Sequence, residues 1–181
     1  MAKLIKIITP DVYLESIYLI DIEKLQQKKN IKGIIVDLDN TLVPWGSNYL
    51  DKKIVSWIKQ VKQSGMKICI VSNTTASHLT DMSNLLDIPF YSSRFKPMKR
   101  PFQKAMKLMN TINRETVVIG DQIFTDVLGG NRLKLLTILV CPLGQNESFG
   151  TAVVNRSLER FILSFWLKNG KIKLIKNKWP A

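Results

Sequence analysis

Acidic side chains are scarce in this chain of 181 residues. It has 14 Asp plus Glu against 27 Lys plus Arg, which gives a formal net charge of +13. A surplus of this size attracts polyanions, such as nucleic acid or an anionic membrane surface, and says nothing about the fold. A solvated basic surface without any partner is the alternative interpretation.

Cysteines and long apolar runs are scarce too. Cys69 and Cys141 each lie within a short apolar run and are expected to be small buried hydrophobic residues. They form neither a disulfide framework nor a metal-ligand pattern, which fits a reducing cytoplasm. No apolar stretch reaches the roughly 18 residues of a membrane span, and no cleavage site follows the basic N-terminus. We therefore expect a cytoplasmic protein that could associate with a membrane only at its surface.

The order of apolar patterns predicts a single α/β domain. Continuous apolar runs, typical of strands buried on both faces, end near residues 36, 71, 119 and 140. Between them, helical spacing predicts helices at 51–63, 75–86, from Pro101 onward, at 125–131 and at 151–168. In the helix at 75–86 we expect four side chains to face inward: Leu79, Met82, Leu85 and Leu86. This alternation is typical of a parallel sheet with right-handed crossovers.

Polar residues follow three of the predicted strands at the point where each ends. Asp37 and Asp39 follow the first, Ser72 and Asn73 end the second, and Asp121 follows the third, with Asp126 five residues later. The carboxyl ends of parallel strands meet at one edge of a sheet, where ligands bind. The sequence therefore predicts one polar site built from distant segments.

Four carboxylates at one edge would repel one another, and some would take up protons unless a cation compensates. A site made of hard oxygen ligands suits Mg²⁺, which also binds phosphate oxygens. Mg²⁺ is therefore the expected cofactor.

These motifs together resemble the haloacid dehalogenase superfamily of phosphatases, subclass IIIA. Four segments carry the resemblance: Asp37-Leu38-Asp39-Asn40-Thr41 (DxDxT), Ser72, Lys96-Pro97, and Gly120-Asp121-Gln122-Ile123-Phe124-Thr125-Asp126 (GDxxxTD). Segments 10–21 and 33–45 also resemble the YqeG-type subfamily, which is related to mitochondrial phosphatidylglycerophosphate phosphatases. The resemblance implies a three-layer Rossmann-like core.

The resemblance also implies catalytic roles. Asp37 would be the nucleophile that forms an aspartyl phosphate, and Asp39 would be the general acid and then the base for water. Ser72 would hold phosphoryl oxygens, and Lys96 would offset charge on the transferring group. Such a division of labour suits phosphoryl transfer, in which positioning and electrostatics dominate.

Metal and substrate ligands follow in the same way. Asp37, the backbone carbonyl of Asp39 and Asp121 would hold Mg²⁺, with Asp126 in direct contact or just behind them. Four further residues are expected to bind substrate: Thr41, Asn73, Lys99 and Arg100. Lys99 or Arg100 could replace Lys96 as the catalytic cation, although Pro97 favours Lys96. His78, the single histidine, is expected to be structural or exposed.

The spacing of the motifs leaves no room for a cap domain over the site. The intervals 41–72 and 73–96 can each hold one helix and little more. We expect an N-terminal extension with a short helix at 1–32, a core at 33–168 and a basic C-terminal tail at 169–181. An uncapped site would admit large substrates such as lipid headgroups, protein phosphates or polynucleotide ends. Small metabolites are an alternative, and the exclusion of water would then need another device such as dimerisation.

Basic residues cluster in two segments and suggest the partner. One set is expected near the mouth of the site: Arg94, Lys96, Lys99, Arg100, Lys104 and Lys107. The other follows the last helix: Lys168, Lys171, Lys173, Lys176 and Lys178. That helix could pack on the sheet or lie at a membrane interface through Phe161, Phe165 and Trp166.

We therefore expect a peripheral membrane enzyme that hydrolyses an anionic phospholipid, with phosphatidylglycerophosphate the leading candidate and no obligate protein partner. A polynucleotide or other macromolecular phosphatase is the second possibility. A non-catalytic basic module that binds nucleic acid is the third, although no aromatic stacking platform is visible in the sequence.

Overall fold

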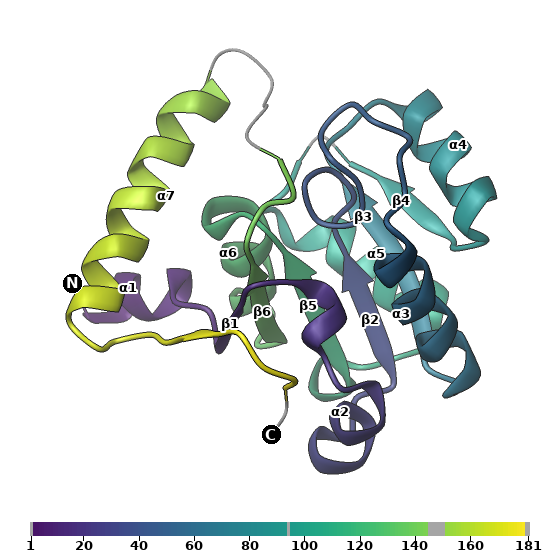
Figure 1. Ribbon diagram of the computed structural model, residues 1–181, viewed down its shortest axis with the longest axis horizontal. Helices are drawn as coiled ribbons and strands as arrows, with labels where there is room; N and C mark the ends of the chain where they lie inside the picture. The colour runs from purple at the N-terminus through teal and green to yellow at the C-terminus, as the bar shows by residue number, and fades with distance from the viewer. Residues whose placement is uncertain (1, 94, 145–150, 180–181) are drawn as a thin grey trace.

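The described part of the chain forms one parallel β-sheet. A computed structural model describes residues 2–93, 95–144 and 151–179. Within these residues the strand order is β4-β3-β2-β5-β6-β1-β7, and every neighbouring pair is parallel. The strands are β1 Val12–Leu14, β2 Gly33–Val36, β3 Lys67–Ser72, β4 Phe90–Ser92, β5 Thr116–Gly120, β6 Leu136–Val140 and β7 Leu174–Ile175. The predicted parallel α/β fold is confirmed (Figure 1).

The helices lie close to their predicted positions. They are α1 Ala2–Ile8, α2 Ile22–Lys29, α3 Lys52–Gln63, α4 Ala76–Leu86, α5 Lys99–Met109, α6 Leu128–Asn131 and α7 Thr151–Lys168, with short turns at η1 Ile17–Leu19 and η2 Asn113–Glu115. One inward-facing residue was predicted wrongly, because Leu85 is 61% exposed. The buried stripe of α4 is Leu79, Met82 and Leu86, and Leu85 points away from it.

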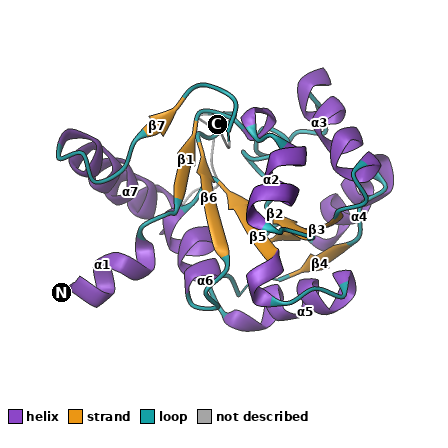
Figure 2. Ribbon diagram, turned by 90° about the horizontal axis from the view of Figure 1, so that it is seen from below, coloured by secondary structure: helices purple, strands orange, loops and turns teal. Residues whose placement is uncertain are grey.

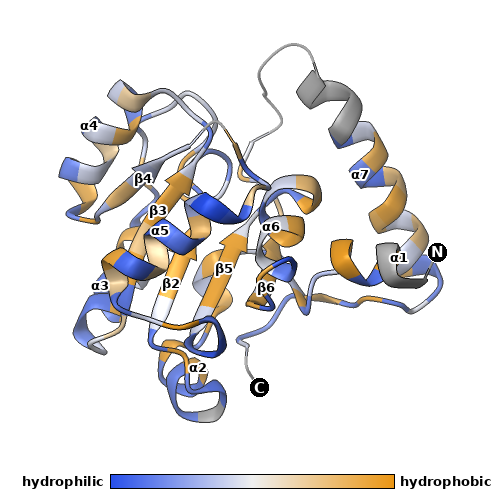
Figure 3. Cartoon of the chain, turned by 180° about the vertical axis from the view of Figure 1, so that it is seen from behind, coloured by the Kyte–Doolittle hydropathy of each residue, from blue (hydrophilic) through white to orange (hydrophobic). Residues whose placement is uncertain are grey.

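Helices cover both faces of the sheet, which gives the three predicted layers (Figure 2). Successive residues of a strand point to opposite faces. Ile34 and Val36 of β2 therefore pack with α3 and α4, whereas Ile35 packs with Phe102 and other residues of α5. Because both faces are covered, the central strands are apolar along their length, as Figure 3 shows.

Both terminal segments extend the sheet beyond the predicted core. Val12–Leu14, within the predicted extension at 1–32, pairs with β6, and Leu174–Ile175, within the predicted tail at 169–181, pairs with β1. The Asn131 side chain donates to the carbonyls of Ile7 and Thr9 at 2.9 Å each, which ties α1 to α6. The segment 1–32 also holds two helices, α1 and α2, in addition to η1. The sheet therefore contains strands from both predicted terminal segments as well as from the predicted core.

The carboxyl edge of the sheet has no cap in the described residues. Only α3 and β3 lie between Thr41 and Ser72, and only α4 and β4 lie between Ser72 and Lys96. Among the helices of the described ranges, none has the length and apolar character needed to cross a bilayer. Cys69 is buried as predicted, and Cys141 is only partly buried beside the Tyr13 hydroxyl at 3.3 Å.

Candidate active site

Asp37 and Asp39 leave the sheet at the end of its central strand. The amide of Asp37 donates to the Ile119 carbonyl at 2.9 Å, so the β2–β5 ladder continues to the first carboxylate. Asn40 then adopts a left-handed conformation with φ 60°, which asparagine tolerates better than most residues. This turn sends the chain back toward Val43 and leaves the Asp39 carboxylate largely buried at the rim, where the Gly46 amide donates to it at 3.4 Å.

Asp121 and Asp126 come from the neighbouring strand β5 and the π-helical turn that follows it. Asp121 directly follows β5, and Asp126 lies in η3, Ile123–Val127. The amide of Gln122 donates to the Asp126 carboxylate at 3.3 Å, which folds that side chain back over Gly120. A Cβ atom at Gly120 would collide with the carboxylate of Asp126, so only glycine allows this close approach.

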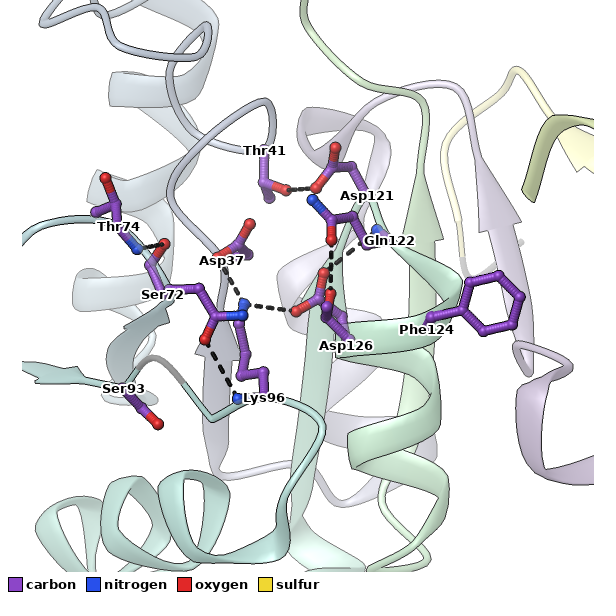
Figure 4. A network of polar contacts seen from close by, with 12 residues as sticks. Asp37, Thr41, Ser72, Thr74, Ser93, Lys96, Asp121, Gln122, Phe124 and Asp126 are labelled. Atoms are coloured by element: carbon purple, nitrogen blue, oxygen red, sulfur yellow. Dashed lines mark hydrogen bonds and ion pairs between the residues drawn. The ribbon is translucent and has the colours of Figure 1, made fainter. Parts of the chain in front are cut away.

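Lys96 lies at the centre of the acidic cluster (Figure 4). Its ammonium group donates to Asp37 Oδ1 and to Asp126 Oδ1, each at 2.7 Å, and its side chain is only 3% exposed. The loop that carries Lys96 is fixed from two sides: the Lys96 amide donates to Asn73 Oδ1 at 3.2 Å, and Arg132 donates to the Pro97 carbonyl at 3.3 Å. The buried ammonium group of Lys96 therefore joins three segments that are far apart in the sequence.

The oxygens of Asp37, Asp121 and Asp126 fit a divalent cation. One carboxylate oxygen from each lies within 4.8 Å of the others, and all three residues are buried. Carboxylate oxygens are the ligands that Mg²⁺ prefers, and three of them can converge on one ion. The donor chemistry and the spacing of these residues thus match the cofactor expected from the sequence.

Burial and mutual repulsion raise the pKa of several of these acids. Burial raises the pKa of Asp121 well above its usual range. Arg156 opposes this shift, and the nearby Asp37 carboxylate adds to it. Burial and then Asp37 also raise the pKa of Asp39. Burial opposes the charge on Lys96, but Asp126 and Asp37 outweigh it and raise the pKa of the ammonium group. The cluster lacks enough positive charge to hold every acid ionised, and a bound divalent cation would supply it.

The remaining predicted residues lie around this centre at different depths. Ser72 ends β3 and is buried, and its hydroxyl accepts from the Thr74 amide at 3.4 Å. Thr41 is buried and donates to Asp121 Oδ1 at 3.4 Å. Asn73 is exposed, apart from its contact with the Lys96 loop.

Lys99 and Arg100 open α5 and are exposed, so the structure places Lys96 and neither of them among the carboxylates. Lys104 and Lys107 lie farther along the same helix. Lys107 is roughly 12 Å of helix beyond Lys99 and therefore away from the mouth. Arg94, predicted to lie near the mouth, falls outside the described residues.

Sequence reasoning missed three polar side chains at this site. His78, expected to be structural or exposed, is largely buried, with Nε2 3.7 Å from Asp39 Oδ1. Arg156 of α7 donates to the Asp121 carbonyl at 2.8 Å and also contacts Oδ2 of Asp121. Glu159, also on α7, accepts from the Phe124 amide at 2.9 Å. The spacing of three between Arg156 and Glu159 was a signal for an ion pair, but it did not indicate that the pair reaches the site.

Comparison with known proteins identifies the family. A family model described as "Mitochondrial PGP phosphatase" matches residues 2–142. "Probable phosphatase YqeG" of Bacillus subtilis (strain 168) is 42% identical over 168 residues, which cover 93% of this chain and 96% of that protein. "Phosphatidylglycerophosphate phosphatase 1, chloroplastic/mitochondrial" of Arabidopsis thaliana is 29% identical over 90% of this chain and 49% of its own length.

A solved structure supports the fold. An uncharacterized protein from Listeria monocytogenes serotype 4b superposes with a TM-score of 0.54 at 21% identity, over 74% of this chain and 99% of that one. The family match spans most of the chain, and the four motifs of the haloacid dehalogenase superfamily lie at one end of the sheet. This protein therefore belongs to the mitochondrial PGP phosphatase family and is a YqeG-type phosphatase of the haloacid dehalogenase superfamily.

Proposed function

We propose that this phosphatase transfers a phosphoryl group to Asp37 and then to water, with Mg²⁺ bound by Asp37, Asp121 and Asp126. The observation that carries the proposal is the buried cluster of these three acids, two of which, Asp37 and Asp126, accept from the Lys96 ammonium group. Carboxylates gathered at a strand edge in this way have no packing benefit, because burial penalises each charge. We therefore assign these carboxylates a role in metal binding and in the reaction.

The protein groups divide the reaction between them. Asp37 attacks phosphorus through one carboxylate oxygen, and the bond from phosphorus to the leaving oxygen breaks. Asp39 gives its proton to that oxygen. Water then attacks phosphorus, the bond from phosphorus to the Asp37 oxygen breaks and releases phosphate, and Asp39 takes the proton of the water. The raised pKa of Asp39 suits its role as the acid in the first step. Ser72 holds a phosphoryl oxygen and Lys96 offsets the charge of the transferring group. When bound, Mg²⁺ would neutralise phosphoryl charge and orient the group for in-line attack.

Metal removal tests the first part of this proposal. Incubation with a chelator should abolish turnover of a small aryl phosphate, and added Mg²⁺ should restore it, because the acids would otherwise repel the substrate. The measurement is the initial rate before and after chelation, with total metal determined on the same sample. Full activity in a sample shown to be free of divalent metal would exclude the metal role.

The proposed substrate is phosphatidylglycerophosphate at an anionic membrane surface. The Arabidopsis relative carries this substrate in its name, and the uncapped edge would let a headgroup reach the site without leaving the bilayer. A hollow of about 630 Å³ lies beside the loop of Lys96. Ser93, Phe95, Met98 and Arg100 contribute to its lining. The Arg100 guanidinium at this hollow suits a lipid phosphate, and the apolar side chains beside it suit the hydrocarbon part of the lipid.

Helix α7 supplies a surface for membrane contact. Trp166 packs against the core, whereas Phe161 and Phe165 are 70% and 58% exposed on the same helix. Exposed lysines follow, including Lys168, Lys173 and Lys176. Each basic residue near an anionic surface contributes about 1 kcal/mol, and apolar insertion adds to it. One face of the helix therefore packs on the protein, and the other is available to lipid.

Substrate ranking tests the lipid assignment. Phosphatidylglycerophosphate in anionic vesicles should be hydrolysed with a much higher kcat/KM than a terminal phosphate on an oligonucleotide. The double variant Phe161→Ser, Phe165→Ser should sediment less with the vesicles and lose lipid turnover, while its activity on an aryl phosphate stays unchanged. Leu108→Ser, which removes a residue 60% exposed on α5, is the matched control.

The opposite ranking would favour the polynucleotide alternative, which the basic surface also suits. Binding alone does not separate the two possibilities, because attraction to either polyanion weakens as salt rises. Turnover on the two substrates separates them.

A further inference from the structure

Helix α7 holds the loop that carries two of the three clustered acids. This loop runs from Asp121, directly after β5, to Asp126 within η3. Arg156 contacts it at its start, with one donation to the Asp121 carbonyl at 2.8 Å and another to the Asp121 carboxylate. Glu159 contacts its middle by accepting from the Phe124 amide at 2.9 Å. Arg156 and Glu159 thus contact the loop at two positions, Asp121 and Phe124.

These contacts are buried and connect to each other. The side chains of Arg156 and Glu159 are only 10% and 5% exposed, and Arg156 Nη1 lies 3.4 Å from Glu159 Oε2. A buried guanidinium needs a carboxylate partner. Arg156 has two, Asp121 and Glu159, and each of these acids gains a cationic partner in return. Helix α7 lies outside the region matched by the family model, which ends at residue 142. The family motifs therefore leave this pair without a role.

The contacts of Asp121 also occupy both oxygens of its carboxylate. Arg156 holds Oδ2, and Oδ1 is the atom that accepts from Thr41 at 3.4 Å. A carboxylate held through one oxygen keeps a single orientation of the other. Partners of this kind, one step behind the ligands of a metal, typically alter metal affinity about 10–100-fold when they are lost.

We propose that Arg156 and Glu159 form a clamp that positions Asp121 and the loop 121–126 for metal binding, with Arg156 the positioning residue that acts on the ligand itself. This inference rests on the metal site proposed above. The clamp makes α7 part of the active site, although the helix is distant in sequence from every motif.

Calorimetric titration of the purified, metal-free protein with Mg²⁺ tests the clamp. Arg156→Met should weaken Mg²⁺ binding about 10–100-fold, because Asp121 loses the side chain that fixes its orientation. Arg156→Lys keeps the charge without the two-pronged donor and should recover part of the affinity. Arg160→Met removes the same charge from an exposed position on the same helix and should bind Mg²⁺ like the wild type. Thermal unfolding without metal checks that each variant is folded.

The outcomes separate the clamp from the metal site. Wild-type protein that binds no Mg²⁺ would overturn the metal site and the clamp with it. Unchanged Mg²⁺ affinity in folded Arg156→Met or Arg156→Lys would overturn the clamp alone. Tighter binding in Arg156→Met would also overturn it, since the guanidinium would then be a competitor for Asp121. If Arg156→Met fails to fold, the Lys variant decides, with weakened binding supporting the clamp.

Discussion

Replacing Asp37 by asparagine should abolish phosphatase activity while the protein stays folded. An amide cannot act as the nucleophile that forms an acyl phosphate, so the first chemical step has no route. The asparagine side chain has nearly the same shape, and it would remove one negative charge from a cluster in which three buried acids repel one another. Thermal stability without metal should therefore equal or exceed that of the wild type.

The test compares initial rates on an aryl phosphate for Asp37→Asn and for Asp81→Asn. Asp81 is exposed on α4, away from the cluster, and its replacement should leave the rate unchanged. Mass spectrometry must show that the Asp37→Asn sample has not deamidated back to aspartate. Wild-type turnover in such a sample would remove Asp37 from the nucleophile role.

Replacing Lys96 by alanine should lower turnover by about 10²–10³-fold, the usual effect of losing one positioned electrostatic group. It should also destabilise the metal-free protein by about 3–5 kcal/mol, because two buried carboxylates lose their shared counter-ion. Asp37 and Asp126 each depend on the same ammonium group at 2.7 Å. Lys96→Met, which keeps most of the side-chain volume, separates the loss of charge from the loss of packing.

Lys99→Ala is the matched control, because Lys99 is only three residues away but exposed at the start of α5. Lys99→Ala should lower kcat by a much smaller factor than Lys96→Ala does. The comparison requires kcat at saturating Mg²⁺, together with denaturant unfolding of each variant. A greater loss for Lys99→Ala than for Lys96→Ala, with both folded, would move the catalytic role to Lys99.

The sheet and the main acids could be predicted because their signals are local. Gly33–Val36 is a short apolar run that stops at Asp37. A strand buried on both faces is expected to be a continuous apolar run of this kind. Parallel strands then bring Asp37 and Asp121 to one edge regardless of details elsewhere. Leu85 was predicted wrongly because periodicity locates a helix better than it locates the edges of its buried stripe.

Other parts of the site carry no local signal. A loop has no periodicity, so spacing alone did not decide between Lys96 and Lys99. Arg156 and Glu159 have the spacing of an ordinary surface ion pair, and the partner of Arg156 lies 35 residues earlier in the chain. His78 of α4 lies close to Asp39, which is 39 residues earlier in the chain, and no local pattern indicates this contact. Strand β1 has three residues, too few for a pattern to show.

Trapping the covalent intermediate tests whether Asp37 is the nucleophile. Wild-type enzyme mixed with substrate is quenched within one turnover and reduced with borohydride, which converts an aspartyl phosphate to homoserine, and the peptide containing residue 37 is then sequenced by mass spectrometry. We predict homoserine at position 37, dependent on both substrate and Mg²⁺, and none in Asp37→Asn. Homoserine at another aspartate, or phosphorylation of a different residue that forms and decays at the rate of turnover, would contradict this assignment.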